Sequence, residues 1–249
     1  MNKNRIGEVY KTFYGEKIEI VRYGGSKDCD VKFENGFVKT KLPFDSIKSG
    51  YIKNPYRKSI YGVGFVGEGN YKYKHAGGGL KSVLCWNTML RRCYDSVLHK
   101  KRPTYKDVTV CEEWHNFQNF AKWFDESYNP ETMKGWHLDK DILVQGNRIY
   151  SPETCCFVPQ EINSAFSIKK VPSSCNTPGI SMEGAKYKVR CRIEGKEVCF
   201  GNFEKEEDAF YTYREAKLRE IKRLADFWKG QIEDKVYKAM YNWIIEITK

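Results

Sequence analysis

The chain has 249 residues and a formal net charge of +11, and 41% of its residues are hydrophobic and 15% aromatic. This apolar share excludes an intrinsically disordered chain, and the length allows one to three domains. The basic excess predicts a polyanionic partner, with nucleic acid as the first candidate and an anionic membrane surface as the second. No stretch approaches the roughly 18 apolar residues of a membrane span, and the first residues lack the apolar segment of a secretion signal. We therefore expect a cytosolic protein, with nucleic acid and not a membrane as its partner.

Nine cysteines are present, an odd number with no C-x-x-C pair, which argues against disulfides in a cytosolic chain. Cys93, Cys111 and Cys155 are one set that could meet as three ligands of a structural zinc ion. Zinc sites normally use pairs of ligands two to four residues apart, however. The preferred interpretation is that these cysteines are small apolar core residues, and zinc stays an alternative.

Residues 6–66 have the pattern of β-strands, including a hairpin whose turn residues Asn35 and Gly36 accept positive φ angles. About five short strands predict a small SH3-like β-barrel over residues 1–66. Such a barrel either binds DNA or braces the next domain. Residues 50–79, rich in glycine, tyrosine and lysine, favour either an extended segment along DNA or a solvated linker.

Two helices are predicted next. Apolar spacing predicts the first over residues 80–96. Its expected apolar face consists of Leu80, Val83, Leu84, Asn87, Leu90 and Tyr94. Arg91 and Arg92 lie off that face and are candidates for contacts with DNA phosphates. The second helix follows Pro103 and carries an aromatic stripe that we expect in the core. The stripe consists of Trp114, Phe117, Phe120, Ala121 and Phe124.

The stretch from Trp136 to Asn163 concentrates polar residues of the kind that hold metal ions. It predicts a strand, a loop, a second strand and a helix that begins near Pro159. His137, Asp139 and Asp141 alternate, so they share one face of the first strand. Lys140 then points to the opposite face, unless the strand ends at Asp139 and the chain turns there.

Several motifs in residues 80–166 resemble phage-encoded HNH homing-type endonucleases: W-x-x-ML-RRCY, VCEEW, LDKDI, YSPETCCFV and a closing Asn. The resemblance implies a ββα unit with an Asp-His pair at the end of its first strand. In that family the acid binds a divalent metal, Mg²⁺ or Mn²⁺, and the His activates water. An Asn or His on the following helix completes the metal site. By position, the metal ligands are Asp139 and Asn163, and Lys140 stands at the position of the base.

Lys140 departs from the family pattern, because a lysine whose pKa is near 10 is protonated at neutral pH and accepts no proton. Three alternatives stay open. Lys140 has a lowered pKa, or stabilises charge while the metal activates water; His137 supplies the base instead; or the site is inactive and only DNA binding is retained.

The segment KYKVRCRI alternates strictly between cations and apolar residues. The cations are Lys186, Lys188, Arg190 and Arg192. With the strands and the helix around it, this pattern predicts a three-stranded sheet that packs on a helix over residues 178–228. Four cations in register repel one another unless a polyanion neutralises them, so DNA contact is favoured over a merely solvated face.

This segment resembles the plant Apetala/ethylene-response DNA-binding domain through PGIS, KYKVRCRI, FGNF and EEDAF…AK. That family lays its sheet into the major groove, which implies base and phosphate contacts from the four cations. Cys199 stands where the family often has a DNA-facing Trp.

The predicted fold class is α+β with several domains. The segments are a barrel (1–66), helices with the HNH-like ββα unit (67–167), a linker (168–177), the DNA-binding sheet (178–228) and a C-terminal helix (229–249). The last helix folds back onto a core or forms a dimer contact.

The first functional hypothesis is a phage HNH-type, metal-dependent endonuclease in the cytoplasm of a bacterial host. It would bind double-stranded DNA through the C-terminal sheet and hydrolyse a phosphodiester. The alternative is a DNA-binding protein with an inactive HNH fold, acting as a regulator or decoy. A third class, a structural or protein-interaction module, is disfavoured by the row of cations.

Overall fold

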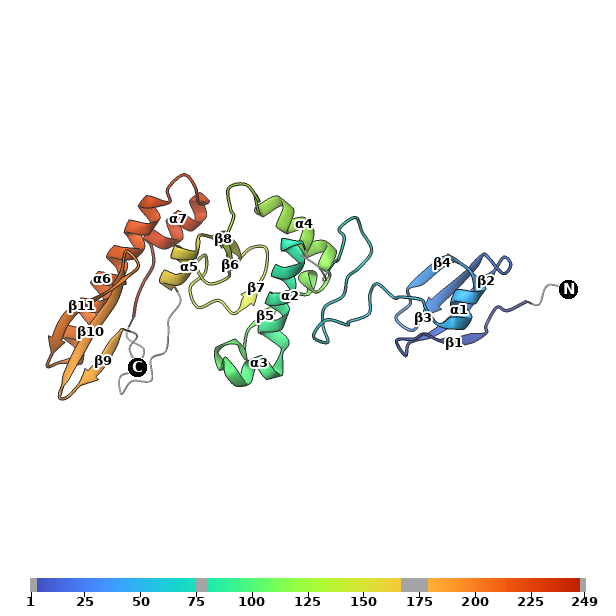
Figure 1. Ribbon diagram of the computed structural model, residues 1–249, viewed down its shortest axis with the longest axis horizontal. Coiled ribbons are helices and arrows are strands. Elements are labelled where there is room, and N and C mark those ends of the chain that lie inside the picture. The colour runs from blue at the N-terminus through green and yellow to red at the C-terminus, as the bar shows by residue number, and fades with distance from the viewer. Residues whose placement is uncertain (1–3, 75–79, 167–178, 247–249) are drawn as a thin grey trace. The chain divides into compact units, whose positions relative to one another are not determined.

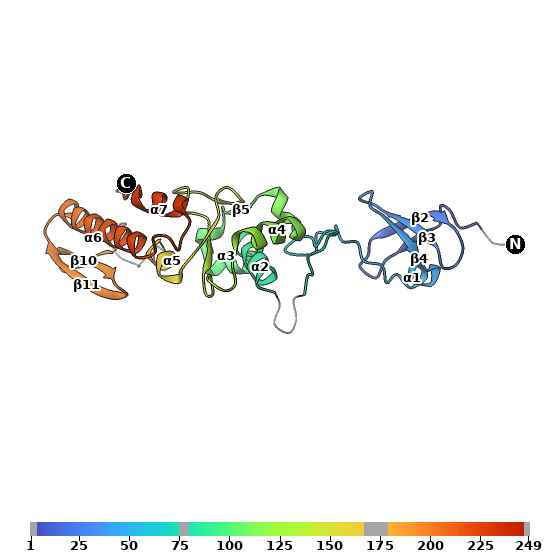
Figure 2. The same ribbon diagram turned by 90° about the horizontal axis from the view of Figure 1, so that it is seen from above.

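The computed structural model describes residues 4–74, 80–166 and 179–246. They form helices and several separate sheets, in a mixed α/β arrangement (Figures 1 and 2). Two compact units result, the first formed by Met1–Val83 with Glu112–Phe120 and the second by Leu84–Cys111 with Ala121–Lys249. The predicted linker at 168–177 lies outside the described residues.

The N-terminal sheet is an antiparallel meander in the order β1-β2-β3-β4. Its strands are β1 (Val9–Lys11), β2 (Lys17–Tyr23), β3 (Cys29–Phe33) and β4 (Val38–Leu42). Gly36 has φ +87° in the β3–β4 turn, as predicted for the Asn35-Gly36 hairpin. One face of the sheet and the short helix α1 (Phe44–Ser49) enclose an apolar core. The core consists of Ile18, Ile20, Cys29, Val31, Phe33, Ile47 and Ile52.

The predicted closed barrel is wrong. β1 and β4 are the two edges of an open sheet and do not pair with each other. After β4 the chain enters helix α1, with Pro43 as the N-cap, and not the fifth strand of the predicted barrel. Proline supplies the helical φ angle and no backbone donor, so it suits a helix start better than a strand interior.

The two central helices form where they were expected, but the first is rotated. Helix α2 (Lys81–Tyr94) buries Val83, Trp86 and Met89, whereas Leu80 and Leu84 stay about half exposed. Trp86 was left out of the predicted face, and burying this large ring sets which side of the helix turns inward. Helix α4 (Phe117–Ser127) buries the predicted aromatic stripe from Phe117 onward, and Trp114 is buried in the 3₁₀ turn at Glu112–His115 that precedes it.

Short elements join these helices to the ββα unit. They are α3 (Ser96–Lys101), a 3₁₀ turn at Pro103–Tyr105, β5 (Thr109–Val110) and β7 (Ile149–Tyr150). β5 and β7 pair in parallel, which ties the loop of the ββα unit to the segment that follows α3.

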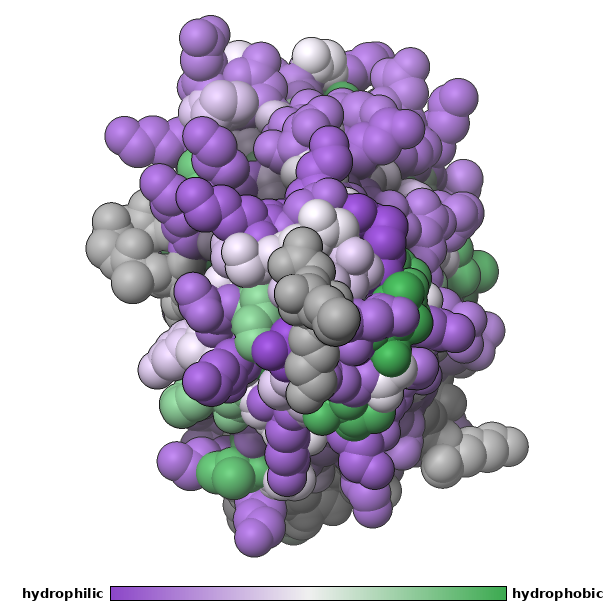
Figure 3. All heavy atoms as spheres, turned by 90° about the vertical axis from the view of Figure 1, so that its right-hand side faces the viewer, coloured by the Kyte–Doolittle hydropathy of each residue, from purple (hydrophilic) through white to green (hydrophobic). Residues whose placement is uncertain are grey.

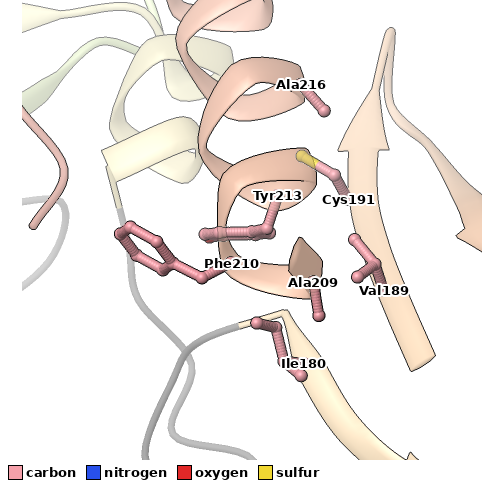
Figure 4. Close-up of a cluster of buried hydrophobic side chains, with 7 residues drawn as sticks. All are labelled: Ile180, Val189, Cys191, Ala209, Phe210, Tyr213 and Ala216. Carbon is pink, nitrogen blue, oxygen red and sulfur yellow. The ribbon is translucent and has the colours of Figure 1, made fainter. Parts of the chain in front are cut away.

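The C-terminal region forms the predicted antiparallel sheet, in the order β11-β10-β9. Its strands are β9 (Ile180–Glu183), β10 (Lys186–Ile193) and β11 (Lys196–Phe203), and helix α6 (Glu206–Phe227) covers one face (Figure 1). The alternation of β10 sends its apolar residues into a cluster with α6 (Figure 4). The cluster consists of Ile180, Val189, Cys191, Ala209, Phe210, Tyr213 and Ala216. The cations of β10 therefore lie on the opposite, outer face.

The tail folds back as a shorter helix than predicted, α7 (Asp234–Tyr241), which packs against α6. Val236 and Met240 are buried, but Ile244 lies beyond the helix and is mostly exposed. Residues 247–249 of the predicted helix lie outside the described residues.

Within the described residues, no helix combines the length and apolarity needed to cross a membrane. The face of the molecule drawn in Figure 3 is mainly hydrophilic, and its hydrophobic side chains lie in small separate groups.

Candidate functional site

The stretch from Trp136 to Asn163 forms a ββα unit. β6 (His137–Asp139) pairs antiparallel with β8 (Cys156–Val158), and helix α5 (Gln160–Phe166) begins directly after Pro159 and packs against β6. The order of strand, loop, strand and helix is therefore confirmed.

Asp139 ends β6 and caps the loop that follows. Its Oδ1 accepts hydrogen bonds from the backbone N–H groups of Asp141 (2.7 Å) and Ile142 (2.9 Å). Within the described part of the chain, its other oxygen, Oδ2, accepts no hydrogen bond. Burial raises the pKa of this carboxyl, although the two backbone bonds and the charge of Lys140 oppose that effect. A divalent cation at Oδ2 would relieve the cost of burying the negative charge.

Lys140 is directed into the loop that follows β6. Its buried ammonium donates to Asp141 Oδ1 (2.5 Å) and to the backbone carbonyl of Asn147 (2.9 Å). It also lies 5.9 Å from the ring centre of Tyr150. Asp141 is thus the ion-pair partner of Lys140, whereas Asp139 caps the loop. The two predicted acids therefore have different roles.

Asn147 organises the same loop through its side-chain amide. Its Nδ2 donates to the carbonyls of Lys140 and Ile149 (2.7 Å each), and its Oδ1 accepts from the Ile149 N–H (3.1 Å). Together, Lys140 and Asn147 close the loop from both ends. An Asn after a glycine is typical of a turn, and this pattern is the sequence signal that could have indicated the bridging.

His137 shares a face with Asp139, two positions away on β6 and roughly 7 Å along the strand. Both side chains are half-buried. Asn163 is also half-buried and lies in the middle of α5, the helix that packs against β6. The structure therefore collects His137, Asp139 and Asn163 in one small unit, and places Lys140 elsewhere in it.

In the described ranges, no three His, Cys, Asp or Glu side chains converge closely enough to hold a metal ion. The candidate ligands Asp139 and Asn163 include only one side chain of these four types, so this absence does not bear on them. Cys93 and Cys155 are buried thiols, and burial raises the pKa of Cys93 to about 12 and that of Cys155 still further. Both thiols thus have the buried surroundings expected of core residues.

Arg91 and Arg92 have different environments. Arg91 is exposed and bonds to Asp95, four residues along the chain (3.3 Å). Arg92 is half-buried, with its guanidinium 5.7 Å from the ring centre of Tyr105. Arg91 is thus the more accessible of the two guanidinium groups, although it is paired with Asp95.

The outer face of the C-terminal sheet mixes both signs of charge. Lys188 bonds to Glu183 (2.8 Å), Arg190 lies 3.8 Å from Glu197, and Lys186 lies 3.8 Å from Glu204. The sequence argument from four unrelieved cations is therefore too strong. These acids lie on β9, β11 and the turn after β11, so only the strand register brings them beside the cations. The Glu194-Gly195 turn could have indicated that Glu197 lies beside the end of β10, opposite Arg192, but it gives no signal for Glu183 or Glu204.

Comparison of the chain with family models, curated proteins and solved structures finds no match.

Proposed function

We propose that this protein is a metal-dependent DNA endonuclease that holds duplex DNA on its C-terminal sheet and cleaves it at the ββα unit. The observation that carries the proposal is Asp139. Its carboxylate has one oxygen fixed by the loop backbone and one open, on the strand face that also carries His137.

Asp139 Oδ2 and the side-chain carbonyl of Asn163 are the oxygen donors that would hold Mg²⁺ or Mn²⁺. Such an ion, when bound, stabilises the charge that develops on a phosphodiester during hydrolysis. His137 is the group that takes a proton from the attacking water, because an imidazole is partly neutral at pH 7. Lys140 holds the loop through Asp141 and Asn147.

Supercoiled plasmid incubated with the protein and Mg²⁺ or Mn²⁺ should become nicked. In this assay His137→Ala should lower the rate by about 10² or more, the usual cost of losing a general base, and added imidazole should restore part of it. Lys140→Met should mainly lower the melting temperature and should retain more activity than His137→Ala. The reverse ranking would assign the base to Lys140. No nicking by wild-type protein with several metals and substrates would contradict the endonuclease proposal.

The second candidate, a DNA-binding protein without cleavage, is favoured by one observation: the residue after Asp139 is a lysine engaged in the loop. This second candidate predicts that the wild-type protein binds duplex DNA but does not nick plasmid, whichever metal is added.

Duplex binding is expected to depend on Arg190 and Arg192. Their joint reversal to Glu should weaken binding about tenfold or more at moderate salt. It should also flatten the slope of log K against log salt by about 0.9 for each phosphate that the protein no longer neutralises. Glu197→Gln is the matched control with the opposite sign, since it removes the acid 3.8 Å from Arg190 and should strengthen binding. Equal affinities for the charge-reversed and wild-type proteins would exclude this face as the DNA-binding surface.

A further inference from the structure

Three aromatic side chains form an exposed strip on the N-terminal unit. Phe13 and Tyr51 are 69% and 71% exposed, and their rings stack with centres 5.4 Å apart and planes 11° apart. Tyr14 meets Phe13 edge to face at 5.7 Å. An exposed aromatic pair of this kind leaves ring faces in water, which points to contact with a partner.

The backbone holds this strip in place. The N–H of Phe13 donates to the carbonyl of Gly50 (2.9 Å), next to Tyr51. Gly50 has φ +72°, and a side chain there would lie 2.9 Å from the carbonyl oxygen of Lys11. Only glycine allows so close an approach of the two segments, so Phe13 and Tyr51 are presented on a fixed frame.

A groove of about 570 Å³ adjoins the strip in the same unit. Tyr14 belongs to both features, because it also lines the groove. The guanidinium of Arg57, a further lining residue, lies 5.1 Å from the centre of the Tyr14 ring. Lys39 and Lys53 bring the basic lining residues to three, against one acid, Glu68.

Hydrogen bonds within the unit hold two of the lining residues. Lys39 Nζ donates to the carbonyl of Lys53 (3.1 Å). The buried amide of Asn54, also in the lining, donates to Glu16 (2.8 Å). A groove of this volume lies within the range of small-ligand sites, roughly 300–1,000 Å³, and accommodates a nucleotide.

We propose that the N-terminal unit binds unpaired nucleic acid, with bases stacked on Phe13 and Tyr51 and the phosphate backbone in the groove of Lys39, Lys53 and Arg57. Flat aromatic faces beside a basic groove are the two parts that single-strand binding requires. In a duplex the base faces are stacked inside and do not reach aromatic side chains, so the ligand is a single strand. The excess of cations favours a polyanion over a protein partner. This site is separate from the duplex-binding and cleavage functions proposed above.

The test measures the fluorescence anisotropy of a fluorescein-labelled oligo(dT) of about twelve nucleotides as full-length protein is added. The buffer contains EDTA, which removes divalent metal and so prevents cleavage. The Arg190→Glu/Arg192→Glu background removes the proposed duplex site, so that remaining binding reports on the N-terminal unit. In that background, Phe13→Ala/Tyr51→Ala should weaken oligo(dT) binding about tenfold, the equivalent of about 1.4 kcal/mol, without changing the salt slope. Lys39→Glu/Lys53→Glu should weaken it and also flatten the slope by about 0.7 for each phosphate that is no longer neutralised.

Tyr61→Ala is the matched control, because it removes a partly exposed tyrosine of the same unit that lies outside the strip. It should bind oligo(dT) as the background protein does. Wild-type affinity in the aromatic variant would overturn the proposal. A change in its oligomeric state by sedimentation, with unchanged oligo(dT) affinity, would also overturn it and assign the strip to a protein contact. Failure of plasmid nicking leaves this test intact, since it uses no metal.

Discussion

Asp139→Asn is expected to reduce plasmid nicking at least a hundredfold while leaving the fold unchanged. The asparagine keeps an Oδ1 that accepts the hydrogen bonds of Asp141 and Ile142, so the loop stays capped. It loses the negative charge and the open oxygen that would bind the metal. Removing a Lewis acid from the reacting phosphate costs several kcal/mol of transition-state stabilisation, which is a factor of 10² or more in rate.

Asp139→Ala serves as the comparison, because it removes the loop cap together with the charge. It should abolish nicking and also melt at a lower temperature than Asp139→Asn. For the wild-type protein, burial raises the pKa of this carboxyl, so protons compete with the metal at a higher pH than for an exposed aspartate. Nicking should therefore decline on acidification before the pH reaches the ordinary aspartate range near 4. Substantial nicking by Asp139→Asn would remove this residue from the metal site.

Gly179→Ala is expected to destabilise the C-terminal sheet by about 2–5 kcal/mol. Gly179 has φ +77°, and an added methyl group would lie 2.1 Å from the Tyr213 ring and 2.7 Å from the carbonyl oxygen of Arg190. The Gly179 carbonyl also accepts the Arg190 N–H (2.8 Å), so the strand cannot withdraw without breaking this bond. Urea unfolding followed by circular dichroism measures the destabilisation, and duplex binding should fall with it.

Gly184→Ala separates the cost of the left-handed backbone from the cost of crowding against Tyr213. Gly184 has a similar positive φ, +64°, but a methyl group there would meet no atom within 4 Å. This variant should cost only about 1 kcal/mol, the contribution of the left-handed backbone alone. Equal destabilisation by the two variants would show that crowding against Tyr213 contributes nothing.

The parts of the fold that the sequence predicted best are those fixed by local alternation. KYKVRCRI alternates over eight residues, and β10 buries Val189 and Cys191 while its cations face outward. The order of elements from Trp136 to Asn163 was also readable, because Gly146 and Pro159 mark its turn and helix start.

Features that depend on contacts distant in sequence could not be predicted. Closure of the N-terminal sheet depends on pairing between its first and last strands, and no local pattern reports that pairing. The rotation of α2 depends on which neighbours receive Trp86. The carboxylates beside the cations of β10 appear only once β9 and β11 are in register.

Because Lys140 is hydrogen-bonded within the loop, mutations at position 140 and at position 137 should have different effects. A change at position 140 acts first on the loop, through Asp141 and Asn147, and only through the loop on the reacting groups. A change at position 137 acts instead on the strand face that carries Asp139. In the proposed endonuclease, His137 and Asp139 would carry the chemistry, and Lys140 would hold the fold of the loop that follows them. Random libraries over positions 137–141, sorted once for solubility and once for nicking, should select different positions.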